Sequence, residues 1–253
     1  MYAEERQQEI LRRARAAGRV DVVSLAGELD VTTETIRRDL TVLERAGVLR
    51  RVHGGAIPVE RMGFEPALAT RDEVMTAEKE RIAKAALAEL PEDGSVIIDA
   101  GSTTGRLVPI LPADRELTVV VNSPPLATVL ATRANLSVIM LGGRVRGRTL
   151  ATVDDWALRP LSQLHVDVAF MATNGCSVAK GLTTPDPAEA AIKRAMVTAA
   201  ERSVLLADHT KFTNTYLASF AELNEIDVVI TDTGLDLALA AELSAAGPEV
   251  VRA

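Results

Sequence analysis

The sequence predicts an α-helical winged helix-turn-helix over residues 1–57 and an α/β domain with a mostly parallel sheet over residues 77–253, joined by a linker at 58–76. Three observations predict this organisation. Residues 20–45 form two short amphipathic patterns separated by a tight turn. Beyond the linker, apolar runs rich in β-branched residues alternate with alanine-rich helical stretches, which is typical of a buried parallel sheet. The linker itself lacks a sustained period and contains prolines and a glycine.

The helix-turn-helix is the most specific pattern in the chain. The first helix carries an apolar stripe at Leu25 and Leu29, and the second repeats apolar residues at i, i+4 and i+7 from Ile36. Thr32 or Thr33 stands where the second helix needs an N-cap. The pattern predicts a recognition unit at about residues 20–39.

Arginines and a hydroxyl lie on the opposite face of the second helix. Stepping 100° per residue from Ile36 places Arg38 and Arg45 on the far side, with Arg37 and Thr41 beside them. Arginine can donate two hydrogen bonds to guanine, and both residue types bind phosphates. Charge on an outer helix face usually serves solvation only, so this face alone does not decide for DNA.

The residues that follow the second helix favour DNA binding. Residues 48–57 contain two short apolar-basic runs that can pair as a β-hairpin wing, whose basic side chains would lie near phosphates. The predicted DNA-binding residues are Thr32, Thr33, Thr35, Arg37, Arg38, Thr41, Arg45, Arg51 and His53.

Charge and composition narrow the class of protein. The net charge is −7, divided into +1 for residues 1–57, whose positive charges are all arginine, and −8 for the remainder. General attraction to DNA is therefore modest, and binding would depend on placed arginines and on two or more heads acting together. The charged N-terminus and the absence of an 18-residue apolar window argue against a secretory signal and a membrane span. A single cysteine excludes an internal disulfide and suits the cytoplasm.

Seven apolar runs predict the strands of the α/β domain. These are residues 96–98, 117–121, 138–141, 166–170, 204–206, 228–230 and 250–251. The helices expected between them include residues 77–90, 103–111, 126–131, 188–200 and 235–245.

Polar residues follow the strands, at the sheet edge where α/β proteins bind ligands. The first strand leads into a Gly-Ser-Thr-Thr-Gly turn and an expected helix, whose N-terminus would favour an anion, although plain helix capping explains these hydroxyls equally well. A separate loop at 181–186 precedes a helix with Glu189 and Lys193. The candidate ligand-binding residues are Asp99, Gly101, Ser102, Thr103, Thr104, Asn122, Gly142, Gly143, Asn174, Thr183, Thr184, Glu189, Lys193, Asp208 and Lys211. They suit a polyhydroxylated, phosphorylated ligand.

Other reactive side chains indicate no further site. Cys176 lacks a nearby histidine and carboxylate, so a structural thiol is expected, and the three histidines lack metal-ligand spacing. Asp99, Asp208 and Lys211 would suit an acid–base set in an isomerase, but binding roles fit them equally well. We expect no catalytic residues, metal or cofactor.

The run TTETIRRDLTVLERAGVLRRVHGGA resembles the N-terminal signature of the DeoR family of bacterial transcription regulators. The segments IIDAGSTTGRL, LGGRV, GLTTPDPAEAAIKRAM and LLADHTKF resemble its effector domain, so the resemblance spans nearly the whole chain. It implies a winged helix that binds operator DNA and an effector domain similar in fold to ribose-5-phosphate isomerase. Val121 and His209-Thr210 depart from the family pattern, which leaves the ligand open.

The resemblance implies a transcription regulator, with repression of a sugar-metabolism operon relieved by a phosphorylated sugar. The expected partners are double-stranded operator DNA, this effector and further copies of the chain in a homodimer or homotetramer. The loop GLTTPDPAEAA resembles actinobacterial members of the family, where fructose operons are a common target, so fructose 1-phosphate is the first expectation. The alternative is a sugar-phosphate isomerase or deaminase-like enzyme with an added DNA-binding head.

Overall fold

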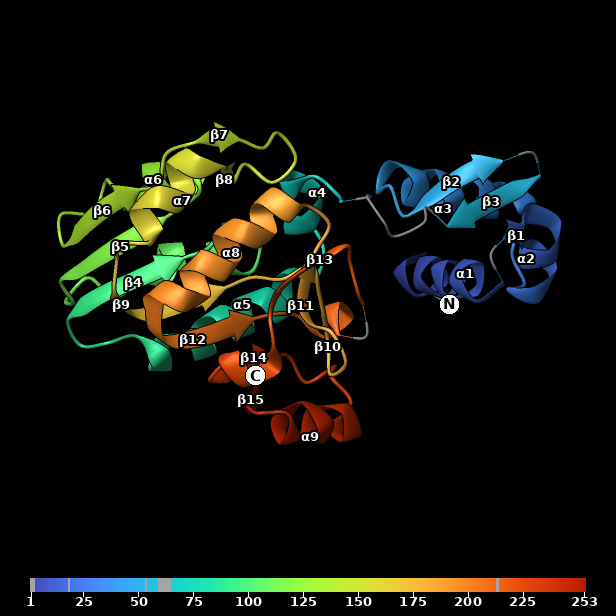
Figure 1. Cartoon of the computed structure of the whole chain (residues 1–253). Helices are drawn as coiled ribbons and strands as arrows, with labels where there is room; N and C mark the ends of the chain where they lie inside the picture. Colours follow the sequence, from blue (N-terminus) through green and yellow to red (C-terminus); the bar gives the residue numbers. More distant parts are fainter. Residues whose placement is uncertain (1–2, 18, 53, 59–64, 213) are drawn as a thin grey trace. The chain divides into compact units, whose positions relative to one another are not determined.

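The computed structural model describes residues 3–17, 19–52, 54–58, 65–212 and 214–253 (Figure 1). The chain divides into two compact units, Met1–Pro66 and Ala67–Ala253, which we call the head and the sensor unit.

The head is a winged helix-turn-helix, as predicted. Its elements are α1 (Ala3–Ala17), β1 (Val20–Asp21), α2 (Val22–Glu28), α3 (Thr33–Arg45), β2 (Leu49–Val52) and β3 (Gly55–Pro58). The predicted stripe residues Leu25, Ile36 and Leu40 are buried together with Ile10 of α1. Strands β2 and β3 pair antiparallel as the wing, and β1 adds to β3.

Local contacts fix the turn and the wing. The hydroxyl of Thr32 accepts a hydrogen bond from the backbone N–H of Thr35 at 3.2 Å, so Thr32 is the N-cap of α3. Gly54 has φ +78°, a conformation that favours glycine. A Cβ on Gly55 would lie 2.0 Å from the carbonyl oxygen of Val20, so only glycine lets β3 approach β1. His53 lies outside the described residues.

A buried carboxylate joins α1 to α3. Asp39 lies on α3 and is 4% exposed. Its Oδ2 accepts from Nε of Arg6 at 2.6 Å, and its Oδ1 accepts from Nε2 of Gln7 at 3.0 Å. Asp39 is therefore part of the framework that orients α3.

The sensor unit contains a seven-stranded, wholly parallel sheet, and all seven predicted strands belong to it. Its order is β15 (Glu249–Arg252), β14 (Val228–Thr231), β12 (Ala200–Leu206), β9 (Val166–Met171), β4 (Gly94–Ile98), β5 (Leu117–Val121) and β6 (Leu136–Met140).

Two hydrophobic clusters cover the two faces of this sheet (Figure 1). One face packs on α7 (Asp155–Leu161), α8 (Pro187–Ala199) and α9 (Leu237–Ala245), and the other on α5 (Thr76–Ala86) and α6 (Pro124–Leu130). The smaller elements are α4 (Leu68–Asp72), η1 (Leu87–Glu89), η2 (Thr104–Arg106), η3 (Val108–Ile110), β7 (Arg144–Val145), β8 (Thr152–Val153), β10 (Gly175–Ser177), β11 (Gly181–Thr184), η4 (His209–Lys211), β13 (Ala218–Ala221) and η5 (Leu223–Glu225).

Three expectations differ from the structure. The helix predicted at 103–111 is wrong: the segment forms the short 3₁₀ turns η2 and η3, because Gly105 is a poor helix former and Pro109 cannot donate a backbone hydrogen bond. The loop expected at 181–186 contains strand β11, which pairs with β10 and β13 in an antiparallel sheet. The linker expected at 58–76 contains α4, which belongs to the sensor unit.

Removing the Asp39 carboxylate should destabilise the head. Asp39→Ala leaves the guanidinium of Arg6 with little solvent and no partner, which costs about 3 kcal/mol of unfolding free energy. Urea unfolding of the full chain measures the loss. Glu34→Ala is the control, because Glu34 forms an exposed ion pair with Arg37 whose loss costs at most about 1 kcal/mol. Equal stability of the two variants would contradict this role of Asp39.

Candidate DNA-reading face and effector site

The predicted DNA-reading face of α3 is exposed. Arg37, Arg38 and Arg45 all point to solvent, and the side chain of Arg37 is 53% exposed with Glu34 at 3.4 Å. The hydroxyl of Thr41 is already engaged, because it donates to the carbonyl of Arg37 at 2.8 Å. On this face the arginine guanidinium groups are therefore the main hydrogen-bond donors for DNA.

The wing is held against α3. The backbone N–H of Arg51 donates to Oε1 of Glu44 at 3.0 Å, and its Nη1 lies 3.4 Å from the hydroxyl of Thr41. This places a wing arginine beside the reading face. The hydroxyls of Thr32 and Thr35 lie 2.9 Å apart at the start of α3, where Thr32 caps the helix, and Thr33 beside them is half-buried.

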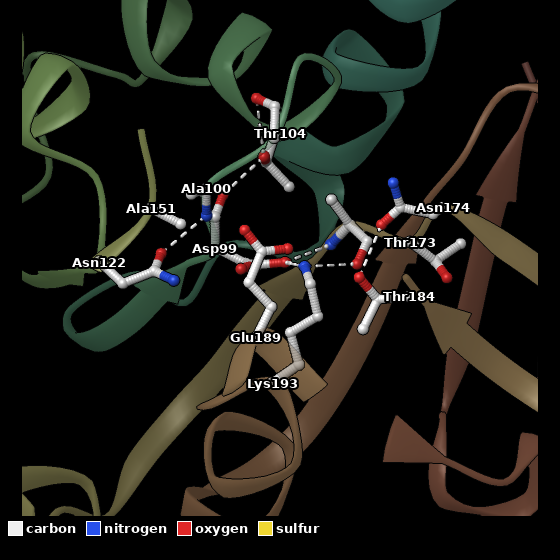
Figure 2. Close-up of polar contacts among 12 residues, drawn as sticks. Asp99, Ala100, Thr104, Asn122, Ala151, Thr173, Asn174, Thr184, Glu189 and Lys193 are labelled. Atoms are coloured by element: carbon white, nitrogen blue, oxygen red, sulfur yellow. Dashed lines mark hydrogen bonds and ion pairs between the residues drawn. The ribbon is translucent and has the colours of Figure 1, made fainter. Parts of the chain in front are cut away.

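In the sensor unit, Asp99 is the centre of a buried polar cluster at the carboxyl ends of β4, β5 and β9 (Figure 2). Its Oδ2 accepts from the backbone N–H of Ala172 at 3.0 Å and from Nζ of Lys193, which also donates to the carbonyl of Ala172 at 3.0 Å. Beside it, the backbone N–H of Ala100 donates to Oδ1 of Asn122 at 2.7 Å.

Burial and the neighbouring lysine have opposite effects on the pKa of Asp99. Desolvation raises the pKa of Asp99, and the ammonium of Lys193 opposes that rise. The carboxylate and the ammonium are thus held together inside the protein, with Lys193 reaching from α8 to the end of β4. The second oxygen of Asp99, Oδ1, is buried without a hydrogen-bond partner among the described residues.

Glu189 lies near this pair on α8 but has its own partners. Its Oε1 is 2.6 Å from Nη1 of Arg146 and accepts from the hydroxyl of Thr149. Nε of Arg146 also lies 3.2 Å from Oδ2 of Asp186, the N-cap of α8. Sequence reasoning missed Arg146 and Thr149, because nothing in their local pattern indicates contact with a helix forty residues away.

Most of the predicted threonines donate hydrogen bonds within the protein. The hydroxyl of Thr104 donates to the carbonyl of Asp99 at 2.6 Å, and that of Thr184 to Oδ1 of Asn174 at 3.0 Å. The hydroxyl of Thr183 donates to the carbonyl of Gly175 at 3.2 Å. Ser102 and Thr103 are buried beside Gly101 in the same turn. No α-helix follows this turn, so these residues do not lie at a helix N-terminus, and ligand binding by them stays a prediction.

The remaining candidates lie on other loops. Gly142 and Gly143 are exposed beyond β6, a strand at the edge of the sheet. Asp208 follows β12 and caps η4 by accepting from the backbone N–H of Thr210 at 3.1 Å. Lys211 ends that turn and is half-buried. The cation paired with Asp99 is Lys193.

The surroundings of Cys176 and His209 indicate structural roles. Cys176 is buried in β10, and burial raises its pKa to about 12, as expected for an inert thiol. Nδ1 of His209 lies 2.8 Å from Oδ1 of Asp232. Within the described ranges no group of histidine, cysteine and acidic residues is suited to a metal ion, and no helix is long and apolar enough to cross a membrane.

Two family models match the chain. The DeoR-like helix-turn-helix domain matches residues 6–61, and the DeoR C-terminal sensor domain matches residues 74–233. The chain belongs to the DeoR family. It is accordingly a DNA-binding transcription regulator with a C-terminal sensor domain.

Relatives in the DeoR family match over nearly their whole length. The HTH-type transcriptional regulator GlpR of Haloferax volcanii is 38% identical over 99% of this chain and 98% of its own. The putative aga operon transcriptional repressor of Escherichia coli O157:H7 is 30% identical, covering 98% and 93%. The solved ribose 5-phosphate isomerase A of Neisseria gonorrhoeae is similar in fold, with 18% identity, a TM-score of 0.40 and coverage of 58% of this chain and 56% of its own.

Substituting either partner of the Asp99–Lys193 ion pair should destabilise this DeoR-family sensor unit, because the other charge is left buried. Lys193→Met leaves the Asp99 carboxylate buried without a cation, which costs about 3–5 kcal/mol of unfolding free energy. Asp99→Asn combined with Lys193→Met should cost clearly less than the sum of the single changes. Urea unfolding measures the cycle, with the exposed Lys84→Met as control. Additive single effects would contradict the coupling.

Proposed function

We propose that this DeoR-family regulator represses a sugar-metabolism operon and releases its operator when a phosphorylated sugar binds the sensor unit. The exposed arginine face of α3 is the observation that carries the DNA part. The buried cluster of Asp99, Asn122 and Lys193 at the strand ends supports the effector part, since carboxylate, amide and ammonium groups bind sugar hydroxyls.

In this proposal the head binds DNA through residues 1–57, and the sensor unit, Ala67–Ala253, binds the effector and forms the oligomer. The name of one relative supports a sugar operon: the L-fucose operon activator of Haemophilus influenzae, which is 31% identical. The name of the putative aga operon transcriptional repressor supports repression. Fructose 1-phosphate is the first effector to test. We propose no reaction for the chain, because these relatives are transcription regulators.

Arg37→Ala and Arg38→Ala should each weaken operator binding. If either guanidinium donates two bonds to a guanine, its loss costs about 1–3 kcal/mol of binding free energy. The measurement is a fluorescence-anisotropy titration of an operator selected in vitro with the full chain, at fixed salt. Arg12→Ala, an exposed arginine on α1, is the control and should bind normally. Wild-type affinity in both α3 variants would contradict the proposed docking.

We further propose that the chain acts as a dimer or tetramer. One recognition helix reads few base pairs, and the head carries a net charge of only +1, so paired heads are needed for specificity. Trp156 on α7 is 81% exposed and Val145 on β7 is 47% exposed, which gives the sensor unit apolar surface for self-association. Sedimentation velocity at micromolar concentration should show an oligomer. A monomer that binds a palindromic operator tightly would contradict the proposal.

Effector response should depend on the strand-end loops. Lys211→Ala removes a half-buried positive charge after β12, and Thr103→Val removes a buried hydroxyl after β4. Both variants should bind operator normally but lose release by the sugar phosphate, because an effector shifts the equilibrium only by its differential affinity. Operator release is measured against a panel of sugar phosphates headed by fructose 1-phosphate. Release at wild-type effector concentrations in both variants would place the pocket elsewhere.

A further inference from the structure

The first residues of the sensor unit form a strap, residues 67–79, that contains α4 and the start of α5 (Figure 1). The backbone N–H of Leu68 donates to the carbonyl of Arg148 at 2.8 Å, and Nη2 of Arg106 donates to the carbonyl of Asp72 at 2.8 Å. Arg106 ends η2, the turn that follows the Gly-Ser-Thr-Thr run. The strap is thus fastened directly to one of the predicted effector loops.

Two arginines at this junction have donors without acceptors. Nε and Nη2 of Arg71, on α4, and Nε of Arg106 are buried with no hydrogen-bond partner among the described residues. Buried guanidinium donors are costly to leave unpaired, and each such group requires an explanation. The two arginines lie on segments in direct contact, since Arg106 bonds to the residue next to Arg71.

Further positive charge surrounds these donors. Lys79 is 2% exposed and donates through Nζ to the carbonyls of Val74, at 2.6 Å, and Arg71. Burial lowers the pKa of Lys79 to about 8; Lys211 and Arg71 also lower it, while Asp208 and Asp72 raise it. Hydrogen bonds to the strap backbone therefore bring the ammonium of Lys79 and the guanidinium of Arg106 to the segment that carries Arg71, in a unit whose overall charge is negative.

We propose that Arg71 and Arg106 form an anion site that binds the phosphate group of the effector. The proposal rests on the proposed function and adds Arg71 and Arg106 to its effector site. Phosphate oxygens are the acceptors that a planar guanidinium fork matches best, and the unpaired Nε and Nη2 of Arg71 are two adjacent donors of one such fork. One residue that contacts the effector would then come from the strap, the segment that continues along the chain towards the DNA-binding head.

Inorganic phosphate is the probe that tests this site in the full-length chain. Calorimetry and thermal unfolding are measured at constant ionic strength, with chloride as the reference anion. Phosphate should raise the Tm of the wild type. Arg71→Gln should weaken phosphate binding at least tenfold and abolish the Tm shift, and Arg106→Gln should weaken it as well. The matched control is Arg81→Gln, an arginine on α5 that is 43% exposed and should bind phosphate normally.

A second readout separates an anion site from a structural role of Arg71. Without phosphate, Arg71→Gln should keep operator affinity and have a Tm no lower than the wild type, because the unpaired donors are removed. A lower Tm combined with an unchanged phosphate affinity would assign Arg71 to the framework and overturn the proposal. The absence of phosphate binding by the wild type would also overturn it, and would leave ordered water as the partner of these donors.

The sugar-phosphate panel distinguishes this site from the proposed function. Should the panel release operator from Arg71→Gln and from the wild type alike, the anion site fails while the proposed function stands. Should inorganic phosphate bind only the wild type while no sugar phosphate releases the operator, the site stands and the proposed function fails.

Discussion

The buried ion pair of Asp99 and Lys193 is the interaction on which the sensor unit depends. Asp99 ends β4, a central strand, and Lys193 reaches it from α8, so one contact joins the sheet to the helix that covers it. The backbone of Ala172 completes the arrangement, since its N–H donates to the carboxylate and its carbonyl accepts from the ammonium. Two charges removed from water are tolerated only with such hydrogen bonds. The strand-end loops are therefore built around an electrostatic constraint as well as an apolar core.

Most of the sensor fold could be predicted because parallel strands are buried on both faces. Runs such as Val119–Val121 are apolar at consecutive positions, and this signal needs no knowledge of the partner strands. Shorter elements could not be predicted in this way. The strand Gly181–Thr184 has one apolar residue and owes its conformation to pairing with β10, just before it in the chain, and with β13, which is distant in sequence. At 103–111 the alternation of strand and helix suggested a helix, and a single glycine and proline decided otherwise.

The candidate sites were predictable in position but not in partners. Ligand residues gather at the carboxyl ends of parallel strands, so Asp99 and Asn122 could be found from the strand pattern. Arg106 and Arg146 contact partners that are distant in sequence, and no local periodicity marks such contacts. Asp39 did carry a signal: it lies 60° from Ile36 and 40° from Leu43 on the helical wheel, at the edge of the apolar face, where a buried acidic residue requires a cation. Arg6 is that cation.

The charge distribution indicates how the anion site that we propose on the strap could affect operator binding. A head with net charge +1 has little general attraction to DNA, so operator affinity depends on where its arginines are held, and small shifts in their placement change it strongly. The strap is the part of the sensor unit nearest the head along the chain, and it carries Arg71. An anion bound by Arg71 and Arg106 would stabilise the docked strap. Linkage is reciprocal, so if docking disfavours the operator-bound arrangement, operator DNA must weaken anion binding by the same factor. Coupling of this kind requires a strap with two arrangements that the two ligands prefer differently, and no continuous pathway of contacts.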